Sequence, residues 1–243
     1  MEESDIVSGY DDVIIPAVGD LIASLPEKPK VILVFVSCLD DLLGTDHEAL
    51  QEKLSEKYPD IQFRSCHMNP ISKGSATPPA ISIQNNIYSL LEQTKSKDTG
   101  VNCIGNLVEI SKQSEIHELL KHLGYGKLKH ISQYQHFEDY QNMAKSAFNL
   151  VIAPPGKQAA QQMEEKLGMP FTFLPVSYRL EQIARNYEQL IKVLAPEKEN
   201  TFDVEPYKQE VEAAIERARK AVGKTPIIVD ASAVKCPFSL ARA

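Results

Sequence analysis

The chain has 243 residues, of which 43% are hydrophobic, and a formal net charge of -7 at pH 7. This length predicts one or two domains with a sizeable core. No apolar run approaches the roughly 18 residues that a membrane helix needs, and no signal-peptide pattern follows Met1, so we expect a cytoplasmic protein without a membrane partner. The acidic charge and the lack of a basic stripe interleaved with aromatic residues exclude nucleic acid as the main partner.

Cysteine and histidine spacing excludes a self-contained metal site. Four cysteines are spread along the chain without a CxxC pair, which argues against a disulfide scaffold and a local zinc site. Of the six histidines, only His117 and His122 are close to ligand spacing, and five residues place them poorly on one helix face. We therefore predict solvated histidines, and any metal would take further ligands from outside this chain. The cysteines are Cys38, Cys66, Cys103 and Cys236.

The most informative stretch is the apolar run at residues 31–36, which leads directly into Ser37 and Cys38. Such a run is typical of a strand buried on both faces of a parallel sheet, and ligands of open α/β sheets bind at the carboxyl edge. The turn that follows predicts a helix start with Thr45 or Asp46 as N-cap and Glu48 in the first turn. Cys38 is thus expected in a loop facing a ligand, although a cysteine at a strand end is often only a small buried side chain.

Hydrophobic periodicity predicts a regular alternation of elements along the chain. Before residue 95 it predicts helices at 13–25, 47–58 and 81–91 and strands at 31–36 and 61–66. A polar stretch at 95–100 then marks a domain boundary. Beyond it the pattern predicts strands at 101–104, 128–132, 150–153 and 171–174, alternating with helices at 113–123, 137–147, 157–167 and 178–194. A long helix at 205–222 and a new strand at 226–230 complete the series.

Four consecutive βα units imply a parallel, doubly wound sheet. We therefore predict an α/β fold of consecutive Rossmann-like domains with parallel doubly wound sheets, the last one truncated. The predicted domains are residues 1–98, with the Cys38 loop, residues 99–196, with four βα units, and residues 197–243. The third would comprise a linking helix and the start of a truncated α/β domain.

Three further residues are candidates for lining a cofactor or substrate pocket. Gly156 and Lys157 lie between a predicted strand and a helix start, where backbone amides and an ammonium group can receive an anion; an ordinary βα turn is the alternative. Cys236 follows the last predicted strand and would face the cleft between the second and third domains. Cys103 is expected in the core. Cys66, which ends a strand beside His67, is expected in a structural role and is a weaker candidate for lining a site.

Other chemistries find little support in the sequence. Gly223-Lys-Thr225 lacks the spacing of a P-loop and precedes a strand instead of following one. No nucleophile elbow or zincin pair is present, and Asp40 and Asp41, being adjacent, cannot both face one site. They are better suited to orient the Cys38 turn through hydrogen bonds to backbone amides. The catalytic residues stay unknown at this stage.

Several segments carry a family resemblance in matching order and spacing over roughly residues 5–240. These are Asp5-Ile-Val-Ser-Gly9, Ser37-Cys-Leu-Asp-Asp-Leu-Leu-Gly-Thr-Asp46, Phe148-Asn-Leu-Val151 and Gln162-Met-Glu-Glu-Lys-Leu-Gly-Met-Pro170. Together they resemble the nitrogenase component-one-like oxidoreductases: the molybdenum-iron protein subunits, their cofactor-assembly scaffold homologues and the dark-operative protochlorophyllide and chlorophyllide reductases.

The resemblance implies a role for Cys38. In that family the matching cysteine ligates an iron-sulfur cluster at a subunit interface, which receives electrons from an ATP-hydrolysing iron protein. A thiolate near a helix N-terminus is also favoured electrostatically. The implied partners are a homologous subunit in a homo- or heterodimer, the ATP-dependent iron protein, and a small-molecule or tetrapyrrole-like substrate.

The sequence departs from the family pattern at two places. No cysteine precedes Cys38, so this chain supplies only one thiolate of the family's cluster site. Ala153 stands where the nitrogenase catalytic subunit has the cysteine that ligates its iron-molybdenum cofactor, so that cofactor is not expected. The intact complex is expected to reduce a substrate through a shared iron-sulfur cluster, with this chain alone inactive. The alternative is a non-catalytic scaffold that binds a small ligand or preformed metallocofactor in the interdomain cleft.

Overall fold

The computed structural model describes residues 11–38, 44–68, 77–231 and 234–242. The chain divides into two compact units, one formed by Met1–Leu91 with His136–Glu138, the other by Glu92–Gln135 with Asp139–Ala243. The predicted division at residues 98 and 196 stays a prediction. The Asp5-Ile-Val-Ser-Gly9 segment and the pair Asp40 and Asp41 lie outside the described residues.

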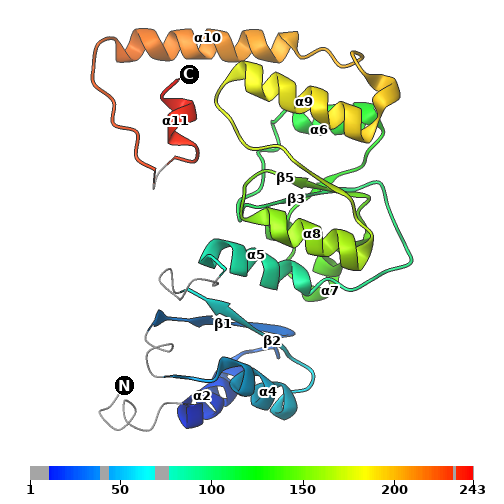
Figure 1. The fold of residues 1–243 in the computed structure, drawn as a ribbon, viewed down its shortest axis with the longest axis vertical. Helices are drawn as coiled ribbons and strands as arrows, with labels where there is room; N and C mark the ends of the chain where they lie inside the picture. The colour runs from blue at the N-terminus through cyan, green and yellow to red at the C-terminus, as the bar shows by residue number, and fades with distance from the viewer. Residues whose placement is uncertain (1–10, 39–43, 69–76, 232–233, 243) are drawn as a thin grey trace. The chain divides into compact units, whose positions relative to one another are not determined.

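The first unit is built on two parallel strands (Figure 1). Strand β1 (Val31–Val36) pairs with β2 (Gln62–His67) in parallel register, with Val31 opposite Gln62 and Val36 opposite His67. Helices α2 (Asp11–Ser24) and α4 (His47–Lys57) lie on one face of this pair and α5 (Pro79–Ser89) on the other. The apolar core of the unit consists of Leu50, Leu54, Ile61 and Phe63, with partly buried side chains such as Ile14, Val18 and Ile32 packed against it.

Strand β1 is less buried than its apolar sequence predicts. Val36 is its only fully buried residue, and Phe35 is 57% exposed. The expectation of burial on both faces is wrong: among the described residues, the apolar cluster of the unit packs on one face of β1. The apolar cluster includes Ile32, and side chains of opposite parity such as Phe35 point to the other face.

The start of α4 follows the predicted capping. Asp46 is the N-cap, and its Oδ1 accepts a hydrogen bond from the Ala49 amide at 3.0 Å, with Glu48 in the first turn. This bond satisfies one of the amides that a helix start leaves unpaired. The strand, turn and helix that surround Cys38 in sequence are therefore confirmed where the structure describes them.

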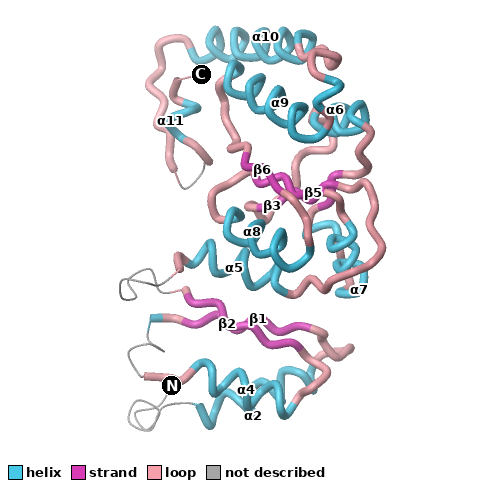
Figure 2. The backbone as a smooth tube through the Cα atoms, turned by 45° about the vertical axis from the view of Figure 1, so that its right-hand side comes forward, coloured by secondary structure: helices cyan, strands magenta, loops and turns pink. Residues whose placement is uncertain are grey.

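The second unit contains a four-stranded parallel sheet in the order β4-β3-β5-β6. Helices α6 and α9 cover one face and α8 the other (Figure 2). Every residue of the two central strands is buried, as expected for strands covered on both faces. The predicted parallel α/β architecture is confirmed. Its elements are β3 (Val101–Ile104), α6 (Ile116–Leu123), β4 (Leu128–Lys129), β5 (Phe148–Val151), α8 (Gly156–Leu167), β6 (Phe171–Phe173) and α9 (Leu180–Leu194).

The predicted strand at 128–132 is shorter in the structure, because His130 redirects the chain. The His130 Nδ1 accepts the Ser132 amide at 3.2 Å, and its Nε2 donates to the Asn106 carbonyl at 3.1 Å. These bonds start the 3-10 helix η1 (Ile131–Gln133) directly after β4. His130 is only 1% exposed, so the prediction of solvated histidines is wrong at this position.

The predicted helix at 137–147 is divided into α7 (Phe137–Tyr140) and the 3-10 helix η2 (Gln141–Lys145). Two lysine side chains bind carbonyls of this segment: Lys129 Nζ donates to Asn142 at 2.9 Å, and Lys97 Nζ to Ala144 at 3.1 Å. These lysines satisfy carbonyl groups that would otherwise pair along an α-helix.

After α9, the 3-10 helix η3 (Pro196–Lys198) leads to α10 (Glu205–Val222), and the last helix is α11 (Pro237–Leu240). The predicted strand at 226–230 is wrong. Ile228 is 93% exposed, and no strand of the described chain pairs with this segment to supply its hydrogen bonds. Among the helices described, none is both long and apolar enough to cross a lipid bilayer.

Candidate functional site

Cys38 lies two residues beyond the end of β1, at the carboxyl edge of the first unit's sheet. Its thiol is free and exposed. A metal ion or a second protein can therefore reach this thiol, whereas it could not reach a cysteine in the core. Because residues 39–43 lie outside the described chain, the surroundings of Cys38 are described only on its amino-terminal side and from Gly44 onward.

Cys66 lies in the neighbouring strand, opposite Phe35 in the register, and is fully buried. Asn86 Nδ2 donates to its sulfur at 3.4 Å and to the Ser65 carbonyl at 2.8 Å. Burial raises the pKa of the Cys66 thiol, an effect that the Asn86 hydrogen bond partly offsets. Cys66 is therefore a protonated core residue, which is the structural role that the sequence favoured for it.

Two histidines lie near the carboxyl end of β2. The rings of His67, the last residue of β2, and His47, the first of α4, meet edge to face with centroids 5.2 Å apart. Across the described residues, however, no group of three or more His, Cys, Asp or Glu side chains is arranged to hold a metal ion. The described part of this unit therefore offers Cys38 as a single exposed thiol and not a complete ligand set.

In the second unit, the loops that follow β3 and β5 meet at the carboxyl edge of the sheet. Gly105 has a φ of +99°, and a Cβ there would lie 2.7 Å from the Ala153 carbonyl oxygen. A Cβ on Gly156 would lie 2.6 Å from the Gly105 Cα. Gly156 therefore allows the start of α8 to pack directly on the end of β3, a close approach that only glycine permits.

The amides at the start of α8 are already partly engaged. Gly156 N donates to the Ala153 carbonyl and Lys157 N to the Pro154 carbonyl, both at 3.1 Å. The exposed Lys157 ammonium lies 4.1 Å from the centroid of the Phe173 ring, in cation-π contact with β6. Both residues lie at the sheet edge where ligands of this fold class bind, and their assignment to a pocket stays a prediction.

The C-terminal segment contacts this same edge. Lys235 Nζ donates to Asn106 Oδ1 at 2.5 Å, just beyond β3. Ser239 Oγ accepts the Tyr178 amide at 3.0 Å and lies 3.1 Å from Ser177 Oγ, beyond β6. The segment that carries Cys236 is therefore held to the edge that also bears Gly156 and Lys157.

The two cysteines of this unit differ in environment. Cys236 is exposed and precedes α11 with a φ of +55°. Cys103 is buried inside β3, and burial raises the pKa of its thiol to about 12, although the nearby Lys235 ammonium acts in the opposite direction. The prediction that Cys103 is a core residue is confirmed, because a thiol with this pKa stays protonated at neutral pH.

Sequence reasoning missed Asn106, Lys235 and Ser239, which attach the C-terminal segment to the sheet. Asn106 carried a signal, since it follows a glycine at the end of a buried strand, where binding residues of α/β proteins gather. Lys235 and Ser239 carried none, because their contacts join positions that are far apart in the sequence.

Comparisons with known proteins agree with this architecture. The chain is similar to the nitrogenase iron-molybdenum cofactor biosynthesis protein NifE of Clostridium pasteurianum, with 23% identity over 178 residues, or 70% of this chain and 37% of that protein. It is also similar to two solved structures of nitrogenase Cp1. The structure at pH 5 matches with a TM-score of 0.62 and 21% identity over 91% of this chain and 43% of that chain. The structure at pH 6.5 matches with a TM-score of 0.60 and 20% identity, over 91% of this chain and 41% of that chain.

The chain spans about two fifths of the length of these relatives. The likeness to the solved structures shows the fold. A model of the nitrogenase component 1 type oxidoreductases matches residues 1–242, nearly the whole chain. The chain therefore belongs to the family of nitrogenase component 1 type oxidoreductases.

Proposed function

We propose that this chain is a subunit, or part of a subunit, of a nitrogenase-like oxidoreductase, in which Cys38 is one ligand of an iron-sulfur cluster shared with a homologous subunit. Electrons would reach the cluster from an ATP-dependent iron protein. The observation that carries the proposal is the exposed Cys38 thiol at the carboxyl edge of β1, in a chain that matches the family over residues 1–242.

The chemistry of the described residues fits one ligand of such a cluster. Iron-sulfur clusters are held mainly by cysteine thiolates, commonly four. In the first unit Cys66 is buried and bonded to Asn86, which leaves Cys38 as the accessible thiol among the described residues. A cluster at Cys38 therefore requires ligands from another chain or from residues outside those described, which is why the proposal places it between subunits.

The second unit would hold the substrate in this proposal. Gly156 and Lys157 begin α8 at the carboxyl edge of its sheet, and Cys236 lies in the C-terminal segment, which contacts the same edge through Lys235 and Ser239. A small-molecule or tetrapyrrole-like substrate would bind at this edge, with Lys157 available to an acidic group. Ala153 offers a methyl group where the resembling catalytic subunit has a cysteine, so no iron-molybdenum cofactor is proposed here.

A second candidate function is that of a non-catalytic scaffold that binds a small ligand or a preformed metallocofactor. It is favoured by the similarity to NifE, whose name describes a cofactor biosynthesis protein, and by the single accessible thiol of the first unit. The two functions differ in what happens to a bound cluster: an oxidoreductase cycles its electrons, whereas a scaffold passes the metal group on.

The test is anaerobic spectroscopy of the chain reconstituted with iron and sulfide beside a homologous subunit. Bleaching of the cluster's visible absorption by an iron protein, only when MgATP is present, supports the oxidoreductase. Transfer of iron to an apo-acceptor protein, without ATP-dependent bleaching, contradicts the oxidoreductase and supports the scaffold. Failure to hold iron under any of these conditions overturns the oxidoreductase and leaves a scaffold that binds a small ligand or a preformed metallocofactor.

A further inference from the structure

A hollow along the outer edge of the second unit's sheet, beside β4, is lined by several charged side chains. It lies between α6 and the outer strand β4 and has a volume of about 790 Å³. That volume is within the range of roughly 300–1,000 Å³ typical of small-molecule sites. Its lining includes the ammonium groups of Lys112, Lys121 and Lys127 and the imidazole of His117, and its single acidic side chain is Glu109. We refer to it as the basic hollow.

The fold brings these side chains to one place on the surface of the second unit. The inner face of α6 is committed to the core through Ile116, Leu119, Leu120 and Leu123. His117 and Lys121 are four residues apart on the other face, so they are neighbours on the helix surface. Gly124 ends α6 in the left-handed conformation, with a φ of +91°, and the returning chain brings Lys127 to the same hollow.

Among the described residues that line the basic hollow, positive charges outnumber negative ones. Lys112, Lys121 and Lys127 form no ion pair with any described residue. Glu109, whose carboxylate accepts a hydrogen bond from Gln133 Nε2 at 2.8 Å, supplies one negative charge, so the hollow keeps a net positive charge. Three unpaired ammonium groups around one concavity repel each other, and an anion bound between them removes that repulsion.

A β-strand of another polypeptide cannot pair with β4 at the hollow. The side chain of Gln133 binds the outer edge of β4, with its Oε1 accepting the His130 amide at 3.2 Å and its Nε2 3.4 Å from the Leu128 carbonyl. An extended peptide that pairs with a sheet edge needs these same backbone groups. This favours a compact ligand over an extended polypeptide.

From the hollow's volume, its converging cations and its blocked strand edge, we propose that the basic hollow binds a small polyanion, a molecule with several phosphate or carboxylate groups. No acidic cluster is available there for a metal cation, and the chain's charge of -7 opposes non-specific attraction of anions. The lining of the hollow includes none of Cys38, Gly156, Lys157 and Cys236, and the proposal does not depend on the proposed function.

The experiment is calorimetric titration of the chain with inorganic triphosphate at low ionic strength, with orthophosphate for comparison. The test variant replaces Lys112, Lys121 and Lys127 by glutamine. The control variant replaces three exposed lysines elsewhere by glutamine and so removes the same charge; these are Lys53, Lys95 and Lys224. All six positions are exposed, so both variants should fold, which circular dichroism verifies.

We expect triphosphate to bind more tightly than orthophosphate and more weakly as salt is added. Affinity should fall by about tenfold or more in the test variant, because three charge contacts are lost, and by less than about twofold in the control. Equal loss in both variants, or no binding to the unmodified chain, overturns the proposal. Tighter binding of an oligoglutamate peptide than of triphosphate also overturns it, since the ligand would then be an acidic polypeptide.

Discussion

At the scale of single residues, burial separates the four cysteines into two kinds. Cys38 and Cys236 are exposed, whereas Cys66 and Cys103 are buried and their thiol pKa values are raised. Only the thiolate is a metal ligand or a strong nucleophile. The sequence predicted a core position for Cys103 from its apolar strand, but the exposure of Cys236 depends on a segment whose predicted strand does not form.

Alkylation by iodoacetamide should therefore distinguish the cysteines. In the native chain at mildly alkaline pH, we expect rapid modification at Cys38 and Cys236 and almost none at Cys66 and Cys103. In concentrated urea all four should react, because burial no longer raises any pKa. Peptide mass spectrometry measures each site, and native modification of Cys103 at the rate of Cys38 would contradict the assigned burial.

Gly156 offers a second test at a single position. A Cβ added there would overlap the Gly105 backbone, so Gly156→Ala should destabilise the chain by about 1–3 kcal/mol through overpacking. Gly168→Ala is the matched control: its φ of +64° costs an alanine about 1–2 kcal/mol, but open space surrounds the site.

Urea unfolding measures both glycine variants. Replacing each glycine by asparagine instead of alanine distinguishes the two causes of destabilisation. Gly168→Asn should recover part of the loss at position 168, because asparagine tolerates the left-handed conformation. At position 156 asparagine should destabilise the chain more than alanine, because its side chain is larger. Recovery at position 156 would refute the close packing of α8 on β3.

At the scale of elements, hydrophobic periodicity predicted those with a buried partner. Val101–Ile104 was expected as a strand and is β3, and the predicted helix at 157–167 is α8, which buries Ala159 and Met163. The errors are at positions where a distant contact decides the structure. His130 ends β4 by bonding to Asn106, and Lys97 and Lys129 bind carbonyls of η2. Such contacts join residues from separate elements, which local periodicity does not report.

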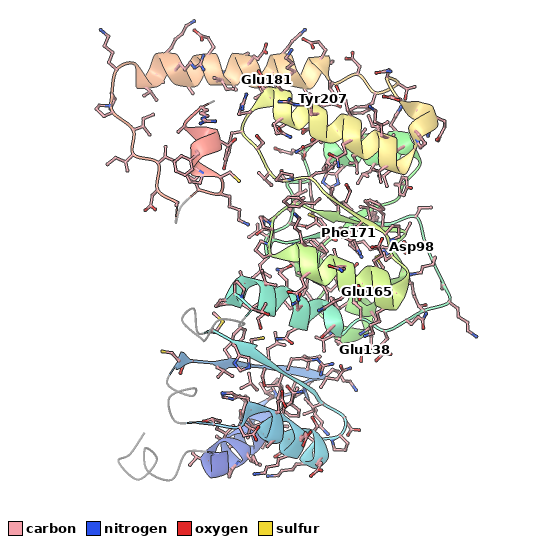
Figure 3. The ribbon with its side chains drawn as sticks, in the orientation of Figure 1. Asp98, Glu138, Glu165, Phe171, Glu181 and Tyr207 are labelled. Carbon is pink, nitrogen blue, oxygen red and sulfur yellow. The ribbon has the colours of Figure 1, made fainter. Side chains whose placement is uncertain are left out.

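An ion pair connects the start of β3 to β4. Asp98, labelled in Figure 3, lies at the amino end of β3, where its carboxylate is 2.6 Å from Lys129 Nζ and accepts the Gly100 amide at 2.7 Å. Burial by itself raises the pKa of Asp98, but the hydrogen bonds from Lys129 and Gly100 and the nearby lysine charges outweigh it, and the pKa is lowered.

The lowered pKa of Asp98 makes its contribution to stability depend on pH. A carboxyl group whose pKa is lowered by folding stabilises the folded state at pH values above its ordinary pKa of 3.8. This contribution is lost as the pH falls through the pKa of the folded state. Asp98→Asn should therefore reduce the urea midpoint near about pH 7 and reduce it less near about pH 3. Asp60, which is 73% exposed in its pair with Lys28, provides the control, and Asp60→Asn should change the midpoint at neither pH. An equal effect of Asp98→Asn at both pH values would contradict the ionic role.

At the scale of the whole molecule, the sequence predicted the parallel α/β class and the family. Both follow from patterns local in sequence: the βα alternation and the motifs around Cys38 and Phe148. The attachment of the C-terminal segment through Lys235 and Ser239 and the basic hollow could not be predicted. They arise where α6, β4 and the C-terminal segment meet other elements in space.

The central claim is that Cys38 ligates a metal-sulfur cluster, and iron and sulfide analysis tests it most directly. The chain and a homologous subunit are reconstituted together under anaerobic conditions, and iron, sulfide and the visible spectrum are measured for Cys38→Ala and Cys236→Ala. Both substitutions remove an exposed thiol. We predict that Cys38→Ala loses most of the iron and sulfide while Cys236→Ala retains them. Full retention by Cys38→Ala, or equal loss in both variants, would contradict the assignment of Cys38 as a cluster ligand.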